Sequence, residues 1–266
     1  MVDLHLHTKF SFDSKEEPEN YINKAVELGV KTIGFSEHYD FDAFLDGEKD
    51  VTLADLDSYT LNINNLRLSY PEMQILQGIE FGYRREAVHQ YEKLLGQYPF
   101  DYVINSLHTL KGRGDCYHDK FFEGRPLRQS YTDYFKGVLE SISADYDYQI
   151  IGHVGYVCRY RTGDDSQIKY VDFAEIIDEI LRAIIAKDKC LEVNTSNGVS
   201  GCTFLPDKDI IQRYIELGGK LLSFGSDAHS IERYFKNAQL LKDFLKDLGI
   251  KELYYFKNRQ PIGYKI

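Results

Sequence analysis

The sequence predicts an α/β fold in which strands and helices alternate and the strands form a parallel sheet. Three observations point to it. Apolar runs of strand length alternate with amphipathic helical patterns over most of the chain. A length of 266 residues is long for an ordinary domain but normal for one α/β barrel. No linker, low-complexity tract or shift in composition divides the chain, so we expect a single domain over residues 1–266.

Each of seven predicted strands is followed by a predicted helix. The strands are expected at 2–7, 31–36, 74–80, 101–107, 148–152, 190–195 and 220–225, and a short run at 252–256 is a candidate eighth. The helices are expected near 18–28, 53–68, 85–97, 129–145, 171–187, 206–217 and 234–248. Pro18 marks a helix start, and Gly29, Gly218 and Gly249 mark helix ends. Seven or eight strand–helix units with right-handed crossovers can close into a barrel.

The composition excludes several classes of protein. With 43% hydrophobic and 28% charged residues, the chain is typical of a soluble globular protein. Its apolar runs fall short of the roughly 20 residues that a membrane span needs, and its N-terminus does not resemble a signal peptide. We therefore expect a cytoplasmic protein without a membrane partner. The net charge of −10 argues against binding nucleic acid, although basic residues gathered locally can bind a small anion.

The opening stretch VDLHLHT places two histidines on one side of a strand. Residues i and i+2 of a strand point to the same face, so His5 and His7 project side by side. The apolar neighbours Val2, Leu4 and Leu6 imply that both faces are packed. Two imidazoles held together inside a fold need a shared partner, which a metal ion can provide. For a single histidine, an ordinary place in the core is the competing interpretation.

Further potential ligands lie where other predicted strands end. They are His38, His108, His153 and His229, with Glu80 at the end of the third strand and Asp227 beside the last histidine. In parallel α/β barrels the carboxyl ends of the strands meet at one end, where the active site lies. A zinc-type ion takes about four ligands, so this many groups exceed the needs of one ion, and a glutamate can bridge two. The pattern predicts a centre with more than one metal.

Six short motifs make the chain resemble the polymerase-and-histidinol-phosphatase (PHP) superfamily. They are DLHLHT at 3–8, SEH at 36–38, GIE at 78–80, SLH at 106–108, GH at 152–153 and SDAH at 226–229. The length, EVNTS at 192–196 and CRYR at 158–161 resemble its histidinol-phosphate phosphatase branch. The resemblance implies a distorted seven-stranded β/α barrel with a trinuclear metal centre. It also implies hydrolysis of L-histidinol phosphate to L-histidinol and phosphate in histidine biosynthesis.

The resemblance further implies which residues hold each ion. It puts His5, His7, Glu80 and Asp227 around the first ion, Glu80 again with His108 and His153 around the second, and Asp13, His38 and His229 around the third. Zinc is the expected metal, with manganese or iron as alternatives, because histidines and carboxylates suit all three. The chain departs from the family pattern at Gly155, where many members have an acidic residue. It also departs after SDAH, where SIERYF replaces the common proline and glycine.

A phosphatase of this kind needs an activated water and cations that neutralise the phosphoryl group. Arg159 and Arg161 follow the fifth strand, and arginine pairs with phosphate bidentately, so we expect at least one to clamp the substrate. A solvated pair of loop arginines is the alternative. Asp227, His229 or a metal-activated water could protonate the leaving alkoxide. The basic stretch 109–128 is a candidate lid, with a solvated loop as its alternative.

The other end of histidinol phosphate carries a cationic amine and an imidazole. Acidic or aromatic groups should therefore lie farther from the metals than the arginines do. Loops at the same end of the barrel offer such groups at Glu37, Tyr39, Asp40, Asp42 and Tyr117.

Two other functions fit the sequence. A phosphoesterase with the same metals could act on nucleotides, phosphotyrosine or nucleic-acid ends, although the acidic charge argues against nucleic acid. Turnover of a panel of phosphate monoesters separates this alternative. The metals could instead be structural and the barrel an interaction module. Metal removal distinguishes this alternative from an enzyme. Loss of a structural metal should unfold the barrel, whereas loss of a catalytic metal should mainly abolish turnover.

Overall fold

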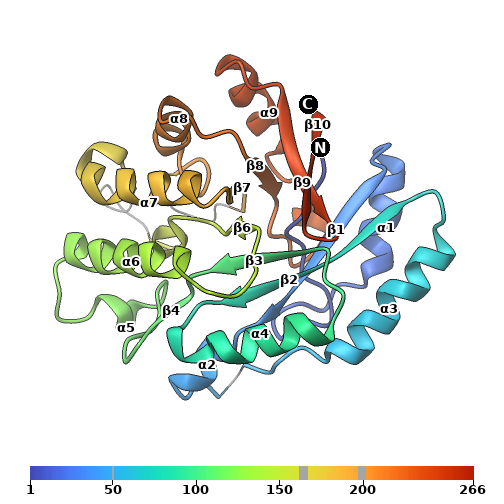
Figure 1. The fold of residues 1–266 in the computed structure, drawn as a ribbon, viewed down its shortest axis with the longest axis horizontal. Coiled ribbons are helices and arrows are strands. Elements are labelled where there is room, and N and C mark those ends of the chain that lie inside the picture. Colours follow the sequence, from blue (N-terminus) through green and yellow to red (C-terminus); the bar gives the residue numbers. More distant parts are fainter. Residues whose placement is uncertain (50, 162–166, 197–201) are drawn as a thin grey trace.

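A parallel sheet of six strands lies at the centre of the molecule, and helices surround it (Figure 1). The structure is a computed structural model, and it describes residues 1–49, 51–161, 167–196 and 202–266. The strands run in the order β1 (Thr32–Tyr39), β2 (Gln74–Gly82), β3 (Tyr102–Ser106), β6 (Ile150–Ile151), β7 (Cys190–Asn194) and β8 (Leu222–Gly225). Every neighbouring pair is parallel, as strand–helix–strand units require.

The opening segment closes this sheet into a barrel. On one side, the amide of Leu4 donates a hydrogen bond of 3.1 Å to the carbonyl of Phe224 in β8. On the other side, the carbonyl of Leu6 accepts a hydrogen bond of 3.0 Å from the amide of Ser36 in β1. Residues 2–7 therefore join the two edges of the sheet, and the distorted β/α barrel is confirmed. Contrary to the prediction, this segment makes isolated bridges rather than a regular strand.

The seven predicted helices are confirmed, with bounds that differ by a few residues. They are α1 (Pro18–Glu27), α3 (Leu56–Ser69), α4 (Val88–Gln97), α6 (Leu127–Ile142), α7 (Ala174–Ala186), α8 (Lys208–Glu216) and α9 (Ala238–Asp247). Gly29 and Gly218 adopt φ angles of 71° and 91° just past α1 and α8, because a left-handed residue commonly ends a helix.

Several shorter elements lie in the loops between these helices and strands. They are α2 (Phe41–Leu45), α5 (Asp119–Phe122), the 3₁₀ turns η1 (Arg85–Ala87), η2 (Tyr156–Cys158), η4 (Tyr170–Asp172) and η5 (Ile231–Arg233), and a small hairpin of β4 (Thr109–Leu110) and β5 (Gly114–Asp115). The basic stretch 109–128 thus has a folded structure of its own. It starts with the hairpin and continues through α5 to the start of α6.

The run at 252–256 does not form an eighth barrel strand, contrary to the expectation. It belongs to β9 (Glu252–Lys257), which pairs antiparallel with β10 (Gln260–Lys265) in a separate sheet. The turn between them consists of Asn258 and Arg259, whose φ angles of 49° and 63° are typical of a tight hairpin. Because the opening segment has already closed the barrel, β9 pairs with its neighbour in sequence instead.

Apolar side chains fill the barrel at the amino ends of its strands. This end cluster consists of Val2, Leu4, Leu76, Tyr102, Ile104, Ile150, Cys190 and, from the hairpin, Phe256. The Tyr102 ring occupies the space over Gly78, where a Cβ atom would lie 2.2 Å from the ring. Its hydroxyl donates to the carbonyl of Leu4 at 2.6 Å. With this end filled, the room for a site lies at the carboxyl ends of the strands.

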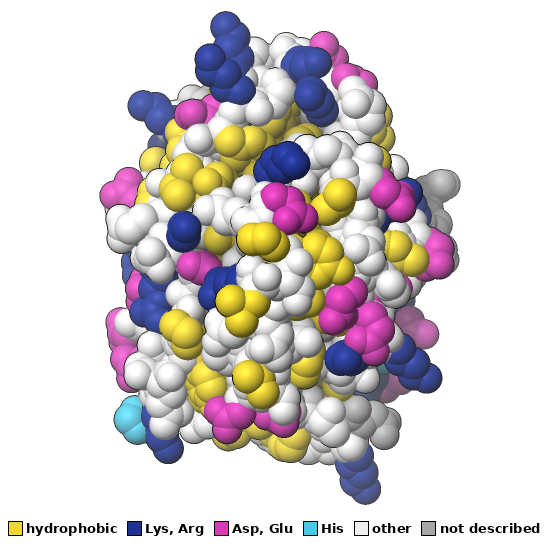
Figure 2. Space-filling view, turned by 90° about the vertical axis from the view of Figure 1, so that its right-hand side faces the viewer, with side chains coloured by type: hydrophobic (Ala, Val, Ile, Leu, Met, Phe, Trp, Pro, Cys, Tyr) yellow, Lys and Arg dark blue, Asp and Glu magenta, His cyan; other side chains and the backbone are white. Residues whose placement is uncertain are grey.

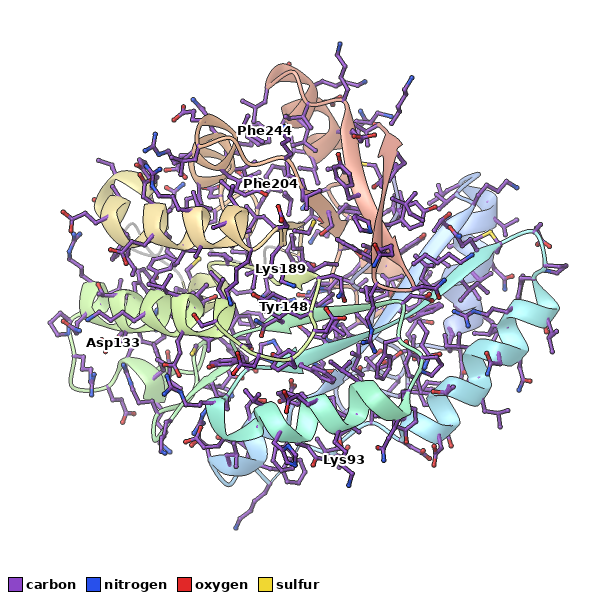
Figure 3. The ribbon with its side chains drawn as sticks, in the orientation of Figure 1. Lys93, Asp133, Tyr148, Lys189, Phe204 and Phe244 are labelled. Atoms are coloured by element: carbon purple, nitrogen blue, oxygen red, sulfur yellow. The ribbon has the colours of Figure 1, made fainter. Side chains whose placement is uncertain are left out.

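Aromatic contacts hold the outer layer together. Figure 3 shows Phe204, which precedes α8, beside Phe244 of α9, and their ring centroids are 5.9 Å apart. Just before β7, Lys189 lies over the ring of Tyr148, with its Nζ 4.5 Å from the ring centroid. The same Nζ donates to the Tyr148 carbonyl at 2.6 Å. The first contact joins the segment before α8 to α9, and the second joins the segments that lead into β6 and β7.

Charged side chains of both signs are mixed on the surface that Figure 2 shows. On the face that Figure 2 shows, basic side chains are interspersed with acidic and apolar ones. Such mixing gives that face no continuous basic track of the kind that a long polyanion follows. None of the described helices combines the length and the apolar character that crossing a bilayer requires.

We expect Phe256→Ala to lower the free energy of unfolding in urea by about 3–5 kcal/mol, because the ring is 3% exposed and packs in the end cluster. The matched control is Lys257→Ala at the exposed neighbouring position, which should change that free energy by less than about 0.5 kcal/mol. Equal effects of the two changes would contradict the packing of the hairpin against the barrel.

Candidate metal centre

A cavity of about 480 Å³ opens at the carboxyl ends of the barrel strands. The loops after β1, β3, β6 and β8 meet around it. Many of the predicted site residues line it, namely Asp13, His38, Asp40, Asp42, His108, Tyr117, His153, Arg159, Asp227 and His229. The structure thus brings together side chains that are far apart in sequence.

The deepest group consists of His5, His7 and Glu80, whose side chains are buried. Oε2 of Glu80 lies 3.2 Å from Nε2 of His5 and 3.5 Å from Nε2 of His7. Oδ1 of Asp227 lies 3.4 Å from the same His7 nitrogen. Within the described part of the chain, these two nitrogens and Glu80 Oε2 have no hydrogen-bond partner. Leaving such atoms unpaired is costly, and their chemistry fits a shared divalent cation.

A second group uses the other oxygen of Glu80. Oε1 lies 2.9 Å from Nε2 of His153 and 3.3 Å from Nε2 of His108. The two histidine nitrogens are 3.4 Å apart, and the hydroxyl of Ser106 donates to the same Glu80 oxygen at 2.6 Å. Because its two oxygens face different histidine pairs, Glu80 can belong to two cation positions at once.

A third group lies nearer the mouth of the cavity. The ligand atoms of His7, His38 and His229 are within 4.8 Å of one another. Oδ2 of Asp13 lies 2.9 Å from Nε2 of His229 and 3.7 Å from Nε2 of His38. This is the arrangement of residues that the family resemblance implies for a third ion.

Burial and charge together shift the pKa values of this cluster. Burial alone would raise the pKa of Glu80, but the histidines around it, His5 foremost, hold that pKa well below its usual range. Burial alone would lower the pKa of His5, but the carboxylates around it hold that pKa well above its usual range. For His7, burial and the charges of neighbouring histidines lower the pKa to about 3. His7 is therefore a neutral imidazole, the form that binds metals.

Two carboxylates lie behind histidine rings, on the side away from Glu80. Oδ1 of Asp40 is 3.0 Å from Nδ1 of His108. Oε1 of Glu192 is 2.6 Å from Nδ1 of His5. A carboxylate on one ring nitrogen orients the ring and leaves the other nitrogen to face the cluster.

Glu37 also lies behind a histidine ring, that of His7, but a serine hydroxyl lies between them. The hydroxyl of Ser11 donates to Oε2 of Glu37 at 2.6 Å, and its oxygen lies 3.1 Å from Nδ1 of His7. Thr8 also donates to Glu37, with its hydroxyl at 2.6 Å and its backbone amide at 3.0 Å. Glu37 thus holds the loop after the opening segment and does not line the cavity.

The five residues that the sequence analysis expected near the amine and imidazole of histidinol phosphate divide into two sets. Asp40, Asp42 and Tyr117 line the cavity, whereas Glu37 and Tyr39 do not. The reason is the alternation of side chains along a strand, which sends Glu37 and Tyr39 to the opposite face from His38 and Asp40. Tyr39 instead packs in the hydrophobic core.

The two candidate clamp arginines are also separated. Arg159 is buried in the cavity wall, and its Nη1 donates to Oδ2 of Asp227 at 2.8 Å. Burial alone would lower the pKa of Arg159, but Asp227 holds it above its usual range, so the guanidinium stays charged. Arg161 does not line the cavity and pairs with Asp119 at 2.9 Å.

Sequence reasoning missed several residues of the site. Besides Glu192, they include Asn194 and Ser196, which donate to Oδ2 of Asp227 at 3.2 and 3.1 Å. All three come from the EVNTS stretch, whose alternate residues point into the barrel. Other missed residues line the cavity, namely Asp115, His118, Tyr156, Tyr160 and Arg233. The length and charge of the 109–128 stretch could have indicated the first two.

The β/α barrel and the cluster of histidines and carboxylates at its mouth are features of metal-binding barrel proteins. Comparison with known families identifies the class more closely. The chain belongs to the PHP domain family, whose model matches residues 3–196.

Individual relatives match over almost the whole chain. The histidinol-phosphatase of Lactococcus lactis is 31% identical over 98% of this chain and 98% of its own. A Clostridium acetobutylicum protein with the name "Probable histidinol-phosphatase" is 34% identical over 90% of this chain and 91% of its own. The crystal structure of the L. lactis histidinol phosphate phosphatase, complexed with zinc, L-histidinol and phosphate, superposes with a TM-score of 0.87. It is 29% identical and covers 98% of both chains.

We expect Glu80→Gln to lower the bound zinc by about one ion per chain or more, because the change removes the negative charge that two groups of ligands share and replaces one of the two oxygens with an amide nitrogen, which cannot accept. The measurement is metal content by plasma mass spectrometry after dialysis against a low zinc concentration. Glu86→Gln, at a partly exposed glutamate outside the cluster, is the control and should keep the wild-type content. Equal metal content in the two variants would contradict the bridging position of Glu80.

Proposed function

We propose that this protein is a metal-dependent phosphomonoesterase that hydrolyses L-histidinol phosphate to L-histidinol and phosphate, a step of histidine biosynthesis. One observation carries the proposal. A single cavity combines the histidine–carboxylate cluster with a buried arginine and with an acidic, aromatic wall. The substrate has the matching chemistry, with a phosphate at one end and a cationic amine and imidazole at the other. The names of the relatives support the same activity.

Three divalent ions are proposed for the centre, with zinc as the metal. The first would be held by His5, His7, Glu80 and Asp227, the second by Glu80, His108 and His153, and the third by Asp13, His38 and His229. Zinc is supported by the L. lactis structure, which contains it, and by donors that are all imidazole nitrogens and carboxylate oxygens. Such ions, when bound, activate water and neutralise the charge of a phosphoryl group.

Arg159 is proposed to clamp the phosphate. Its contact with Asp227 holds the guanidinium at the cavity wall beside the candidate ligands. The hydrogen bond to Asp227 uses Nη1, which leaves other N–H groups of the guanidinium for phosphoryl oxygens. A charged guanidinium fixed in this way stabilises the phosphoryl charge without having to move during the reaction.

Proton transfer to the leaving alkoxide is assigned to a water molecule in the cavity, because Asp227 and His229 are both proposed as metal ligands. Burial alone would raise the pKa of Asp227, but Arg159 and the histidines hold it well below its usual range. Asp227 therefore stays ionised and acts as a ligand rather than as a proton donor. His229 also lines the cavity, but as a metal ligand it would keep only its Nδ1 proton, and that nitrogen lies 3.1 Å from the backbone carbonyl of Asp227.

The amino-imidazole end is proposed to lie against Asp42 and Tyr117. Both oxygens of Asp40 already face His108 and His38, at 3.0 and 3.2 Å, so Asp40 has less to offer a ligand. Tyr117 packs edge-on against Tyr156, with centroids 5.4 Å apart. The tyrosine rings give a flat imidazole an aromatic surface, and a carboxylate nearby favours the amine.

We expect L-histidinol phosphate to have a kcat/KM at least about tenfold higher than a simple aryl phosphate or a nucleoside monophosphate, a difference of roughly 1.4 kcal/mol. The physical reason is that only the first substrate offers an amine and an imidazole to the acidic, aromatic wall. The measurement is phosphate release from the three substrates under one set of conditions. If either competitor is hydrolysed as efficiently, the assignment to histidine biosynthesis is wrong and a general metallophosphatase remains.

We expect Arg159→Ala to reduce kcat/KM for L-histidinol phosphate by about 100- to 1,000-fold, because a preorganised charge on the phosphoryl group is lost. Metal content should stay at the wild-type level. Arg161→Ala is the matched control, since Arg161 lies outside the cavity lining and pairs with Asp119. Similar kinetics for both variants would remove Arg159 from its proposed place at the phosphate.

A further inference from the structure

Glu192 is a buried carboxylate that takes no part in the proposed hydrolysis. It lies on β7 and is 1% exposed. Because alternate residues of a strand share a face, it points into the barrel with Cys190 and Asn194. Cys190 belongs to the apolar end cluster, whereas Asn194 bonds to Asp227 at 3.2 Å. Glu192 therefore lies between the filled end of the barrel and the candidate metal centre.

Both oxygens of Glu192 are engaged by residues of that centre. Oε1 lies 2.6 Å from Nδ1 of His5. Oε2 accepts hydrogen bonds from the backbone amide of His153 at 2.7 Å and from Nδ2 of Asn194 at 3.3 Å. Because amide nitrogens can only donate, Oε2 is an acceptor. A carboxylate is the group that accepts on both of its oxygens.

The contact with His5 decides which ring nitrogen carries the proton. With Nδ1 donating to Glu192, a neutral His5 has its lone pair on Nε2. That nitrogen faces Glu80 and Asp227, whose oxygens are 3.2 and 3.9 Å away. It is the atom that must be unprotonated to bind a metal.

The neighbouring strand leaves space for this pair. On β8, a Cβ atom added to Gly225 would lie 2.2 Å from Oε1 of Glu192 and 2.7 Å from Cβ of His5. Any larger residue at Gly225 would force the carboxylate and the imidazole to move. The absence of a side chain at this position is therefore a second, independent sign that the contact matters to the site.

We propose that Glu192 is a positioning residue of the metal centre. It holds His5 in the tautomer that offers Nε2 to the first ion, and through the His153 amide it fixes the chain that carries a ligand of the second ion. One carboxylate thus orders ligands of two ions without binding either. The inference rests on the metal centre of the proposed function but not on its substrate.

The test compares zinc affinities, measured by competition with a chromophoric chelator. In Glu192→Gln the side-chain nitrogen cannot accept, so one of the two contacts is lost. We expect the zinc dissociation constant to rise about 10- to 100-fold. Glu192→Asp keeps the charge but is one methylene shorter, so it should also weaken binding. Glu140→Gln, at a glutamate that bonds to Arg85 outside the centre, is the matched control and should bind zinc like the wild type.

A second measurement uses the unaltered protein and does not depend on how the variants fold. In long-range ¹H–¹⁵N spectra of the zinc-loaded wild type, we expect His5 to be protonated at Nδ1 and zinc-bound at Nε2. Protonation at Nε2 would overturn the inference, as would a folded Glu192→Gln whose zinc dissociation constant stays within twofold of the wild type. Neither measurement involves a substrate. Failure of this inference is therefore distinct from failure of the wild type to hydrolyse histidinol phosphate.

Discussion

The buried carboxylate of Glu80 is the constraint around which the rest of the molecule is arranged. Its two oxygens lie between 2.9 and 3.5 Å from ring nitrogens of His5, His7, His38, His108 and His153. A charge buried this deeply is tolerated only when it is paired. The five rings come from four segments of the chain, which are the opening segment, β1 and the loops after β3 and β6. Barrel closure and strand register must therefore both be correct before the negative charge of Glu80 is paired with the histidines.

Glycines at the carboxyl ends of β2 and β6 make room for polar groups of the site. A Cβ atom on Gly152 would lie 2.3 Å from the Ser106 hydroxyl, which bonds to Glu80. A Cβ atom on Gly82 would lie 2.1 Å from a carboxylate oxygen of Asp42. In a barrel this narrow, a polar side chain fits inside only where the adjacent strand has none. The site therefore depends on glycines that lack a side chain as well as on the polar side chains that occupy the space beside them.

Much of the fold and of the cluster could be predicted because parallel strands impose their own geometry. A histidine or carboxylate at the carboxyl end of a strand must lie at the same end of the barrel as the others, whatever the loops do. Side chains whose direction depends on local detail were harder to place. Glu37 and Tyr39 are one residue away from cavity-lining positions, and the alternation along β1 turns them away from the cavity. Arg159 and Arg161 were hard to place for another reason, because they follow the 3₁₀ turn η2, where strand alternation does not apply.

The C-terminal hairpin escaped prediction for a different reason. A two-residue hairpin with a type I′ turn has two left-handed residues and is usually marked by Asn-Gly or Asp-Gly in the sequence. Here the second of the two is Arg259, a residue that rarely adopts such angles, so no sequence signal marks the turn. The hydrophobic pattern of 252–256 alone cannot distinguish a barrel strand from a strand that covers the end of the barrel.

The pairing of Leu4 with Phe224 also sets the order in which the protein can be completed during its synthesis. The segment that carries His5 and His7 leaves the ribosome before its partner β8, by roughly 10 to 50 seconds at ordinary rates of translation. Until then the segment lacks one of its two neighbours. The His-x-His pair is thus available to metal ions long before Asp227 and His229 exist. The complete set of ligands can assemble only after β8 and the loop that carries Asp227 and His229 have been synthesised.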